Sequence, residues 1–437
     1  ETPKGDKKLR VRLGQIRERG TEAKIPLSSL FDPQTRAYLA FLRYPGTIRA
    51  MAGIVLLNGG IIVLGNCLGP LNSMLVDGFG IKGYYPEELA NTGAAYPWVG
   101  AQINFIFALG YLLHFILAAI FPWESLKQVY LTPHFAWTAA GAIAITFYNF
   151  GLFQTGILDP TCLAVAVVIQ AFYLSIACAI VWPIIKKITK GQFGFGHGQS
   201  TLLVTSALFA KILGNPKKST EEVKFPEGFQ WLKETLIVSV VIFTPLFLIP
   251  CLLLGPEVVE STWSGGTNFV IWSIKMALTG AAGIEIILIG IRMFIGEILP
   301  AFTGISQKLL RGTIPALDCP AIYPFAPVAQ MIGIAVYTVV NVAVLAVQAI
   351  FGIGPLILPN IFGFIFVGSS AGVVGNAVGG LRGAIICAAV YAVLYPLVAA
   401  IAIPFLGMEK MGMLATMSVD EGILSIIIGG VLKLLGF

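Results

Sequence analysis

The sequence predicts an all-α polytopic membrane protein with about ten transmembrane helices. Of its 437 residues, 57% are hydrophobic and only 11% are charged. Ordinary soluble domains contain roughly 45–50% apolar and about 25% charged residues. Several apolar runs also reach the length of about 20 residues that a helix needs to cross a hydrocarbon core roughly 30 Å thick. The chain is therefore expected to reside in a bilayer.

Ten segments are predicted to cross the membrane, because each is predominantly apolar along its length. They are residues 50–68, 98–121, 135–158, 162–185, 236–254, 269–291, 328–351, 356–380, 384–405 and a short last one, 422–437.

The distribution of charge predicts the orientation of these spans. Residues 1–50 contain 11 Lys and Arg against 5 Asp and Glu, and residues 186–233 contain 8 against 3. Cytoplasmic loops carry an excess of Lys and Arg, so both segments are expected on that side. We interpret residues 1–44 as a basic cytoplasmic tail that sets topology, with contact to anionic lipid or nucleic acid as the alternative. Residues 45–437 then form the membrane transport domain.

Two stretches interrupt the helical pattern. The first is "GQFGFGHGQSTLL" (191–203), and the second is "GTIPALDCPAIYPFAP" (312–327). Each is expected to form a re-entrant hairpin, near 191–213 and 304–330. Irregular backbone at membrane depth is tolerated only where protein buries it or water lines it, so such segments usually build a substrate site. The order of spans around them predicts two related halves with inverted topology.

Each interruption carries a candidate functional residue. Asp318 is an acid at expected membrane depth, which is costly unless it faces a cavity or a partner; the alternative is a carboxylate that caps a short helix. His197 lies in a glycine-rich bend, where a ligand could approach the backbone, or it bonds its own loop. His134 follows "YLTP" and belongs either to the site or to the interface. His114 is expected to be a packing residue.

A metal site or a disulfide framework is not expected. The six cysteines show no CxxC spacing and fall in or beside apolar segments, so we interpret them as small core residues. The three histidines are scattered along the chain, whereas zinc would need a denser cluster.

The long block "GIRMFIGEILPAFTGISQKLLRGTIPALDCPAIYPFAP" (290–327) resembles the ascorbate-type permease, the membrane IIC component of the bacterial sugar phosphotransferase system. Four shorter motifs follow the family's order: "AYPWVG" (95–100), "LTPHFAW" (131–137), "GFGHGQ" (194–199) and "VVGNAVGGLRGA" (373–384). The resemblance covers about residues 45 to 437. That family normally has one more span before the equivalent of residues 50–68, so this chain is expected to be a divergent member or to lack a first helix.

The resemblance implies a substrate pocket that includes His134, His197 and Asp318. Where the family has a glutamine one turn after the first histidine, this chain has Thr138. The residue after His197 is Gly198 rather than glutamine, which leaves Gln199 one place later. A site that reads hydroxyl groups through hydrogen bonds discriminates strongly between substrates. The loss of two amide side chains therefore allows a substrate other than ascorbate, and we expect an ascorbate-like or related sugar or polyol.

The resemblance also implies group translocation by a homodimer in the bacterial inner membrane, with no bound cofactor. The sugar would be exposed to the cytoplasm and phosphorylated by a phosphocysteine of a soluble IIB partner, itself supplied by IIA. Asp318 would then act as the catalytic base for the attacking hydroxyl. The enzymatic step depends on that partner, and nucleic acid has no expected role.

A proton- or sodium-coupled secondary transporter of a small polar solute is the alternative. Asp318 and His197 would then form an ion relay. Glu285 fits this alternative, because it precedes Arg292 by about two helical turns and could pair with it.

Overall fold

The computed structural model describes residues 33–80, 100–153, 159–223, 234–308, 310, 312–354, 356–357, 363–406 and 419–437. The first 32 residues of the expected basic tail lie outside this range. Residues 33–44 belong to the first described helix, α2 (Pro33–Ser73).

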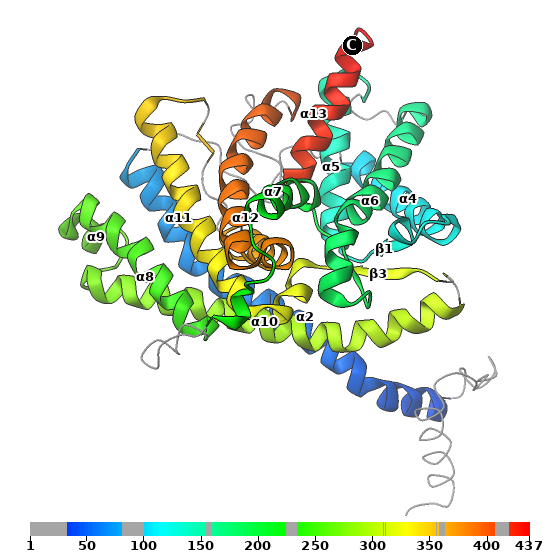
Figure 1. Ribbon diagram of the computed structural model, residues 1–437, viewed down its shortest axis with the longest axis horizontal. Helices are drawn as coiled ribbons and strands as arrows, with labels where there is room; N and C mark the ends of the chain where they lie inside the picture. Colours follow the sequence, from blue (N-terminus) through cyan, green and yellow to red (C-terminus); the bar gives the residue numbers. More distant parts are fainter. Residues whose placement is uncertain are drawn as a thin grey trace, which may run out of the picture.

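The described chain is built mainly of helices (Figure 1). After α2 these are α4 (Gly100–Ile120), α5 (Pro133–Asn149), α6 (Pro160–Thr189), α7 (Ser200–Leu213), α8 (Thr235–Leu254), α9 (Pro256–Thr262), α10 (Phe269–Lys308), α11 (Pro327–Phe351), α12 (Gly368–Leu406) and α13 (Val419–Leu434). Short π-helical or 3-10 segments are η2 (Met74–Gly78), η3 (Glu124–Leu126), η4 (Thr220–Glu222), η6 (Cys319–Phe325) and η7 (Gly363–Val367). The prediction of a predominantly helical membrane protein is confirmed.

Within the described residues, seven helical stretches are long and apolar enough to cross a membrane. They are Ile48–Gly78, Gly100–Ile120, Pro160–Thr189, Leu236–Leu254, Phe269–Phe302, Pro327–Phe351 and Gly363–Phe405. The sequence predicted ten, and the difference has two causes. The described parts of the predicted spans 356–380 and 384–405 fall in one stretch, Gly363–Phe405, which is broken at Gly380 between them. Helices α5 and α13 contain only 17 and 16 residues. The exact number of crossings stays a prediction.

Helices α2 and α10 pack against each other along a seam of small residues. A Cβ atom added to Gly53 would lie 2.6 Å from the carbonyl oxygen of Gly290, and one added to Gly290 would lie 2.5 Å from that of Gly53. Gly60 and Gly283 repeat this arrangement seven residues along each helix, with 2.8 Å from the Gly60 position to the Gly283 oxygen. Small residues at such spacing let two membrane helices approach closely.

Helix α12 is broken at Gly380, whose φ of 61° lies in the left-handed region that favours glycine. The loop between α7 and η4 forms backbone hydrogen bonds with α12 on both sides of this break. The backbone N–H of Asn215 donates to Gly379 O over 2.7 Å, and that of Leu381 donates to Lys218 O over 2.7 Å. These bonds satisfy backbone groups that the interruption of the helix releases.

Glu221 in η4 holds the start of α11. Its carboxylate accepts the backbone N–H of Ala329 at 3.1 Å and that of Val328 at 3.4 Å. The first N–H groups of a helix have no partner within the helix, and a carboxylate there also interacts favourably with the helix dipole. The loop after the first interruption thus supports the helix that follows the second.

A three-stranded parallel sheet, which the sequence did not predict, joins the two interruptions. Strand β3 (Ile314–Leu317) lies between β1 (Gln128–Tyr130) and β2 (Gly194–Phe195). Tyr130 pairs with Ala316, and Phe195 pairs with Leu317. The strands contain only two to four residues and come from distant parts of the chain, so no alternating pattern marks them in the sequence.

The second interruption is shorter than expected, because α10 continues as a helix through Pro300 to Lys308. The region predicted as a hairpin near 304–330 therefore begins inside α10 and contains β3 and η6. The region near 191–213 contains β2, the glycine-rich bend and α7. Their re-entrant path and the inverted repeat stay predictions.

Candidate functional site

The parallel sheet brings the three predicted residues to one edge. His134 follows β1 and lies in the first turn of α5, His197 follows β2, and Asp318 directly follows β3. Because all three strands run in the same direction, their carboxyl ends meet at the same edge, where ligands bind in open parallel sheets. Thr132 also donates its hydroxyl hydrogen to Gly196 O, which ties the ends of β1 and β2 together.

Two glycines allow β2 to lie this close to its neighbours. A Cβ atom at Gly194 would overlap the side-chain amide of Gln128 at 1.8 Å, and one at Gly196 would lie 2.9 Å from Ala316 O. The glycine spacing of "GFGHG" therefore has a steric reason, since any side chain at either position would push β2 away from the sheet.

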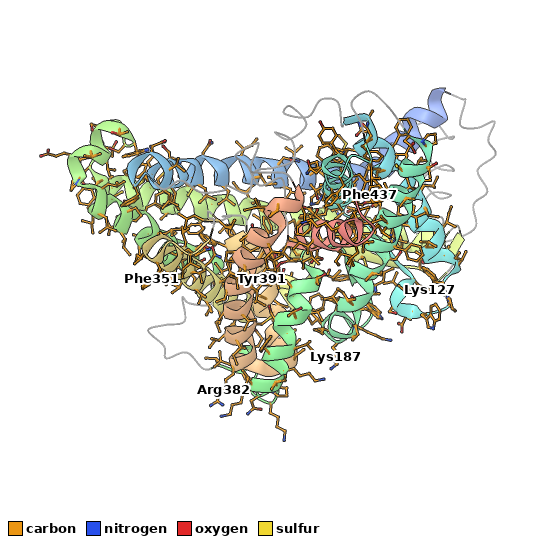
Figure 2. The ribbon with its side chains drawn as sticks, turned by 90° about the horizontal axis from the view of Figure 1, so that it is seen from above. Lys127, Lys187, Phe351, Arg382, Tyr391 and Phe437 are labelled. Atoms are coloured by element: carbon orange, nitrogen blue, oxygen red, sulfur yellow. The ribbon has the colours of Figure 1, made fainter. Side chains whose placement is uncertain are left out.

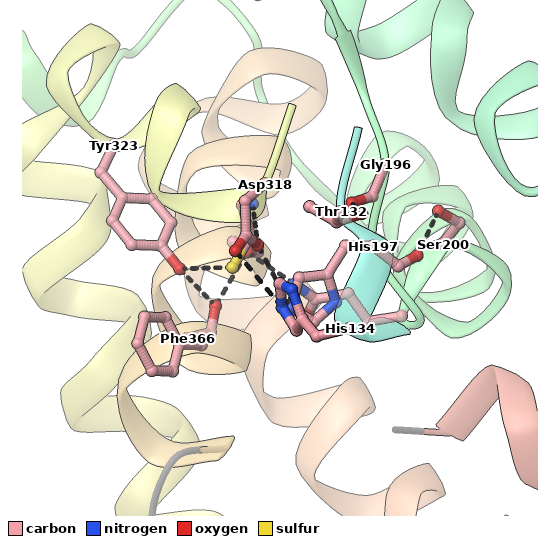
Figure 3. Close-up of polar contacts among 11 residues, drawn as sticks. Thr132, His134, Gly196, His197, Ser200, Asp318, Tyr323 and Phe366 are labelled. Carbon is pink, nitrogen blue, oxygen red and sulfur yellow. Dashed lines mark hydrogen bonds and ion pairs between the residues drawn. The ribbon is translucent and has the colours of Figure 1, made fainter. Parts of the chain in front are cut away.

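Asp318 faces both histidines (Figure 3). Its Oδ1 lies 3.7 Å from His197 Nε2, and its Oδ2 lies 3.7 Å from His134 Nε2. His197 is almost fully buried, whereas the side chains of His134 and Asp318 are 51% and 36% exposed. His197 and Asp318 therefore lie close together, as the shared pocket implied by the resemblance requires. The cluster is open on the His134 side and closed on the His197 side.

His197 is held by aromatic rings. Its ring centroid lies 3.9 Å from that of Phe135 and 5.9 Å from that of Phe195. Burial lowers the pKa of His197 to about 4, and the nearby Asp318 only partly opposes this shift. The imidazole is therefore neutral at pH 7. Its Nδ1 is buried without a hydrogen-bond partner among the described residues, so it can serve a ligand.

Asp318 has the capping role that was the alternative for it in the sequence, and its functional role stays a prediction. Its Oδ1 accepts the backbone N–H of Cys319 at 2.7 Å, which makes it the cap of η6. The same carboxylate faces the two histidines. Behind it, the hydroxyl of Tyr323 donates to Phe366 O at 2.8 Å and contacts Cys319 Sγ at 3.1 Å, so η6 is anchored to η7.

Thr138 and Gln199 do not join the exposed cluster. Both are buried. Thr138 donates its hydroxyl hydrogen to Glu421 Oε1 in α13. The side-chain amide of Gln199 donates to Ser370 Oγ in α12 over 3.0 Å, and its Oε1 has no partner among the described residues. Their predicted contact with substrate stays a prediction, while their contacts in the structure join the histidine-bearing segments to neighbouring helices.

Sequence reasoning missed Asp420 and Glu421 at the start of α13, both fully buried. Asp420 accepts the backbone N–H of Thr201 at 3.0 Å, and its own N–H donates to Gly198 O at 3.0 Å. Together with the bond from Thr138 to Glu421, these contacts fix the segments that follow His134 and His197. The available signal was the pair of adjacent acids before an apolar run. Acids are common at the start of a helix because they favour its dipole, so this pair did not stand out.

Two further expectations concern histidine and charge. His114 is a packing residue, as expected. It is buried, its Nδ1 lies 2.9 Å from Ser175 Oγ, and its Nε2 accepts the backbone N–H of Tyr130 in β1.

Glu285 and Arg292, both described, form no ion pair with each other. An ion pair between α10 and α2 instead joins Glu297 to Arg49 at 3.6 Å. The observation that favoured an ion-coupled transporter is therefore absent.

A small cavity lies beside η6 in addition to the exposed cluster. Its lining includes Arg292, Tyr323 and Gln330, and Gln330 Nε2 has no hydrogen-bond partner among the described residues. None of the three clustered residues lines this cavity. We place the candidate site at the cluster, because convergent ionisable groups at an accessible surface provide the chemistry that a small polar ligand requires.

Comparison with known proteins gives two findings. Residues 44–422 match the family described as the PTS system sugar-specific permease component, EIIC-GAT. The chain is also 24% identical over 387 residues to a protein of Mycoplasma pneumoniae named "Ascorbate-specific PTS system EIIC component". That alignment covers 78% of this chain and 58% of the relative, so the chain spans somewhat more than half of the relative's length.

Proposed function

Because this chain belongs to the family of sugar-specific permease components of the phosphotransferase system, we propose that it carries ascorbate or a closely related sugar across the membrane. The single observation that supports a binding site at the cluster is the convergence of His134, His197 and Asp318 at one sheet edge. The name of the Mycoplasma pneumoniae relative favours ascorbate as the substrate.

In this proposal each residue of the cluster has a separate role. Neutral His197 offers a donor or an acceptor from its buried ring. His134 lies at the exposed entrance. Asp318 accepts hydrogen bonds from sugar hydroxyls. The first turn of α5 begins at this edge, and its unpaired N–H groups favour electron-rich oxygens such as those of an enediol.

Asp318 is also the proposed catalytic base for phosphoryl transfer. A sugar hydroxyl attacks the phosphorus of a phosphocysteine on the soluble IIB partner, the P–S bond breaks, and the thiolate leaves. The hydroxyl proton passes to the Asp318 carboxylate. The partner supplies the phosphoryl group, so the permease itself needs no bound cofactor. Positioning and base catalysis are its contributions.

The basic end of the molecule is the proposed docking surface for IIB. Exposed bases there include Lys187 and Arg382, which Figure 2 shows at the same end. Lys217 and Lys218 are exposed in the loop that is bonded at the break of α12. A basic surface attracts a partner that carries a phosphoryl group. This end would face the cytoplasm of the bacterial inner membrane, and we expect a homodimer there.

The test replaces Asp318 by Asn and measures uptake and phosphorylation of labelled ascorbate with phosphorylated IIB. Asn keeps the helix cap but cannot accept the proton, so we expect the rate to fall about a hundredfold or more. The matched control is Asp159→Asn, because Asp159 caps α6 by accepting the N–H of Cys162 at 2.8 Å. If Asp318→Asn leaves uptake unchanged, Asp318 is not the catalytic base and serves only to cap η6.

A further inference from the structure

Three potential metal ligands of three chemical kinds meet at the cluster. Donor atoms of His197, Asp318 and Cys319 all lie within 4.8 Å of one another. His134 lies outside this group of mutually close donor atoms, but its Nε2 is 3.7 Å from Asp318 Oδ2. Figure 3 shows both imidazole rings and the sulfur atom next to the Asp318 carboxylate. The fold thus assembles the dense group that scattered histidines in the sequence did not predict.

We propose that His134, His197, Asp318 and Cys319 form an inhibitory site for Zn²⁺, at which a bound ion excludes the sugar. The ligand set matches the chemistry of zinc. Imidazole nitrogen, thiolate sulfur and carboxylate oxygen are the donors that Zn²⁺ takes in proteins, usually four of them in a tetrahedron. Mg²⁺ prefers oxygen ligands in octahedral geometry and would not be held here.

The distances are close to those that zinc requires. Zinc bonds of about 2.0–2.3 Å in a tetrahedron place neighbouring ligand atoms roughly 3.3–3.6 Å apart. His197 Nε2 lies 3.7 Å from Asp318 Oδ1, and His134 Nε2 lies 3.7 Å from the other oxygen, Oδ2. To bind one ion, His134 must move toward Oδ1, or both carboxylate oxygens must face the ion. Some pairs involving the sulfur are bounded only by 4.8 Å and can need a larger shift. The 51% exposure of the His134 side chain leaves it free to adjust.

The charge balance also favours Zn²⁺. One carboxylate and one thiolate carry two negative charges, and the two histidines are neutral ligands. The loaded site would therefore have no net charge, which lowers the cost of holding the ion in a partly buried position. The thiol releases its proton on binding, so the affinity rises with pH.

The surrounding contacts predict moderate affinity rather than a permanent structural ion. Tyr323 can donate to the Cys319 sulfur, and the Cys319 N–H donates to Asp318 Oδ1. However, His197 Nδ1 has no partner among the described residues, whereas a metal-bound histidine usually donates its second ring N–H to an acceptor. Loss of such a partner typically weakens binding 10–100-fold. We therefore expect reversible occupancy.

The first experiment measures Zn²⁺ binding to the purified full chain in detergent by calorimetry, without any sugar. We expect one ion per chain, and no comparable binding of Mg²⁺. Co²⁺ as a spectroscopic substitute should show a thiolate-to-cobalt charge-transfer band. Cys319→Ser should abolish this band and weaken Zn²⁺ binding at least tenfold. The matched control is Cys387→Ser, since Cys387 is an equally buried thiol outside the cluster.

His134→Ala provides a second variant, because an exposed side chain is removed with little risk to folding. It should also weaken Zn²⁺ binding at least tenfold. Zinc binding that survives both substitutions unchanged, or a cobalt complex without the charge-transfer band, overturns the site. So does absence of zinc binding to the unmodified chain.

The proposal that bound zinc excludes the sugar rests on the proposed sugar site, and a separate measurement tests it. Zn²⁺ has no redox chemistry, so ascorbate can be the competing ligand without changing the ion. Zinc should raise the apparent Kd of ascorbate linearly with the free Zn²⁺ concentration, as competition for one site requires. Zinc binding without any ascorbate binding would support the metal site and count against the proposed function. Binding of both ligands together would overturn the inhibition.

Discussion

Glu421 at the start of α13 accepts a hydrogen bond from the hydroxyl of Thr138 in α5, although the two helices lie far apart in the sequence. Thr138 follows His134 by one helical turn. The bond therefore connects a buried acid to the segment that carries one residue of the cluster, and it occupies the hydroxyl that the sequence assigned to substrate.

We predict that Thr138→Val destabilises the protein by about 1–3 kcal/mol, because a buried acceptor loses one of its donors. Thr138→Ser keeps a hydroxyl and is the matched control. Thermal unfolding in detergent measures the difference, and the apparent KM for ascorbate should rise in the Val variant alone. Identical behaviour of the two variants would mean that the bond contributes nothing.

Glu221→Gln should weaken the start of α11, because the charged acceptor for the N–H groups of Val328 and Ala329 is lost. The expected loss is about 0.3–1 kcal/mol, the range for a charge at a helix terminus. Glu222→Gln, at an exposed neighbouring position, is the control. Hydrogen exchange of the first turn of α11 measures the effect, and equal exchange in both variants would refute it.

The stability of the α13 contact should depend on pH through Asp420, which lies before the apolar part of that helix. Burial raises the pKa of Asp420 from 3.8 to about 7, and the N–H of Thr201 only partly opposes the shift. Between these two values the folded state binds the proton more tightly than the unfolded state does. Stability therefore falls as the pH rises through this window.

Asp420→Asn should remove this slope, because Asn does not titrate. The check is the midpoint of thermal unfolding at several pH values across the window. Asp159→Asn, an exposed cap of α6, should leave the slope in place. A pH profile that is the same with and without Asp420 would show that another group is responsible.

Gly290→Ala should destabilise the packing of α2 against α10 strongly, since the new methyl group would lie 2.5 Å from Gly53 O, a backbone atom. We expect a destabilisation of about 1–3 kcal/mol or more, the range that is typical of overpacking. Gly296→Ala in the same helix has no atom within 4 Å and should be neutral or stabilising by about 0.5–1 kcal/mol. Thermal unfolding of the two variants in detergent provides the comparison, and equal midpoints would contradict the seam.

The sequence was informative where the signal is local. Long apolar runs identified most helices, and the His197 bend and Asp318 stretch were recognisable from glycine and proline. The sheet was not predictable, because β1, β2 and β3 pair with strands from distant parts of the chain. Thr138 and Gln199 bond to residues of α13 and α12, which lie far away in the sequence. The periodic pattern of apolar residues carries no information about such contacts. The end of α10 was misplaced because Pro300 is tolerated within it.

The order of the strands has a consequence for directionality. Backbone bonds hold β3 between β1 and β2, and separating them would leave N–H and C=O groups unsatisfied. If the proposed site carries the sugar, we expect Asp318 and the two histidines to move together when the site changes its exposure. A site whose geometry did not change would offer the sugar the same intrinsic affinity on both sides of the membrane. Accumulation would then depend on the chemical conversion of the delivered sugar, which makes release irreversible, rather than on weaker binding inside the cell.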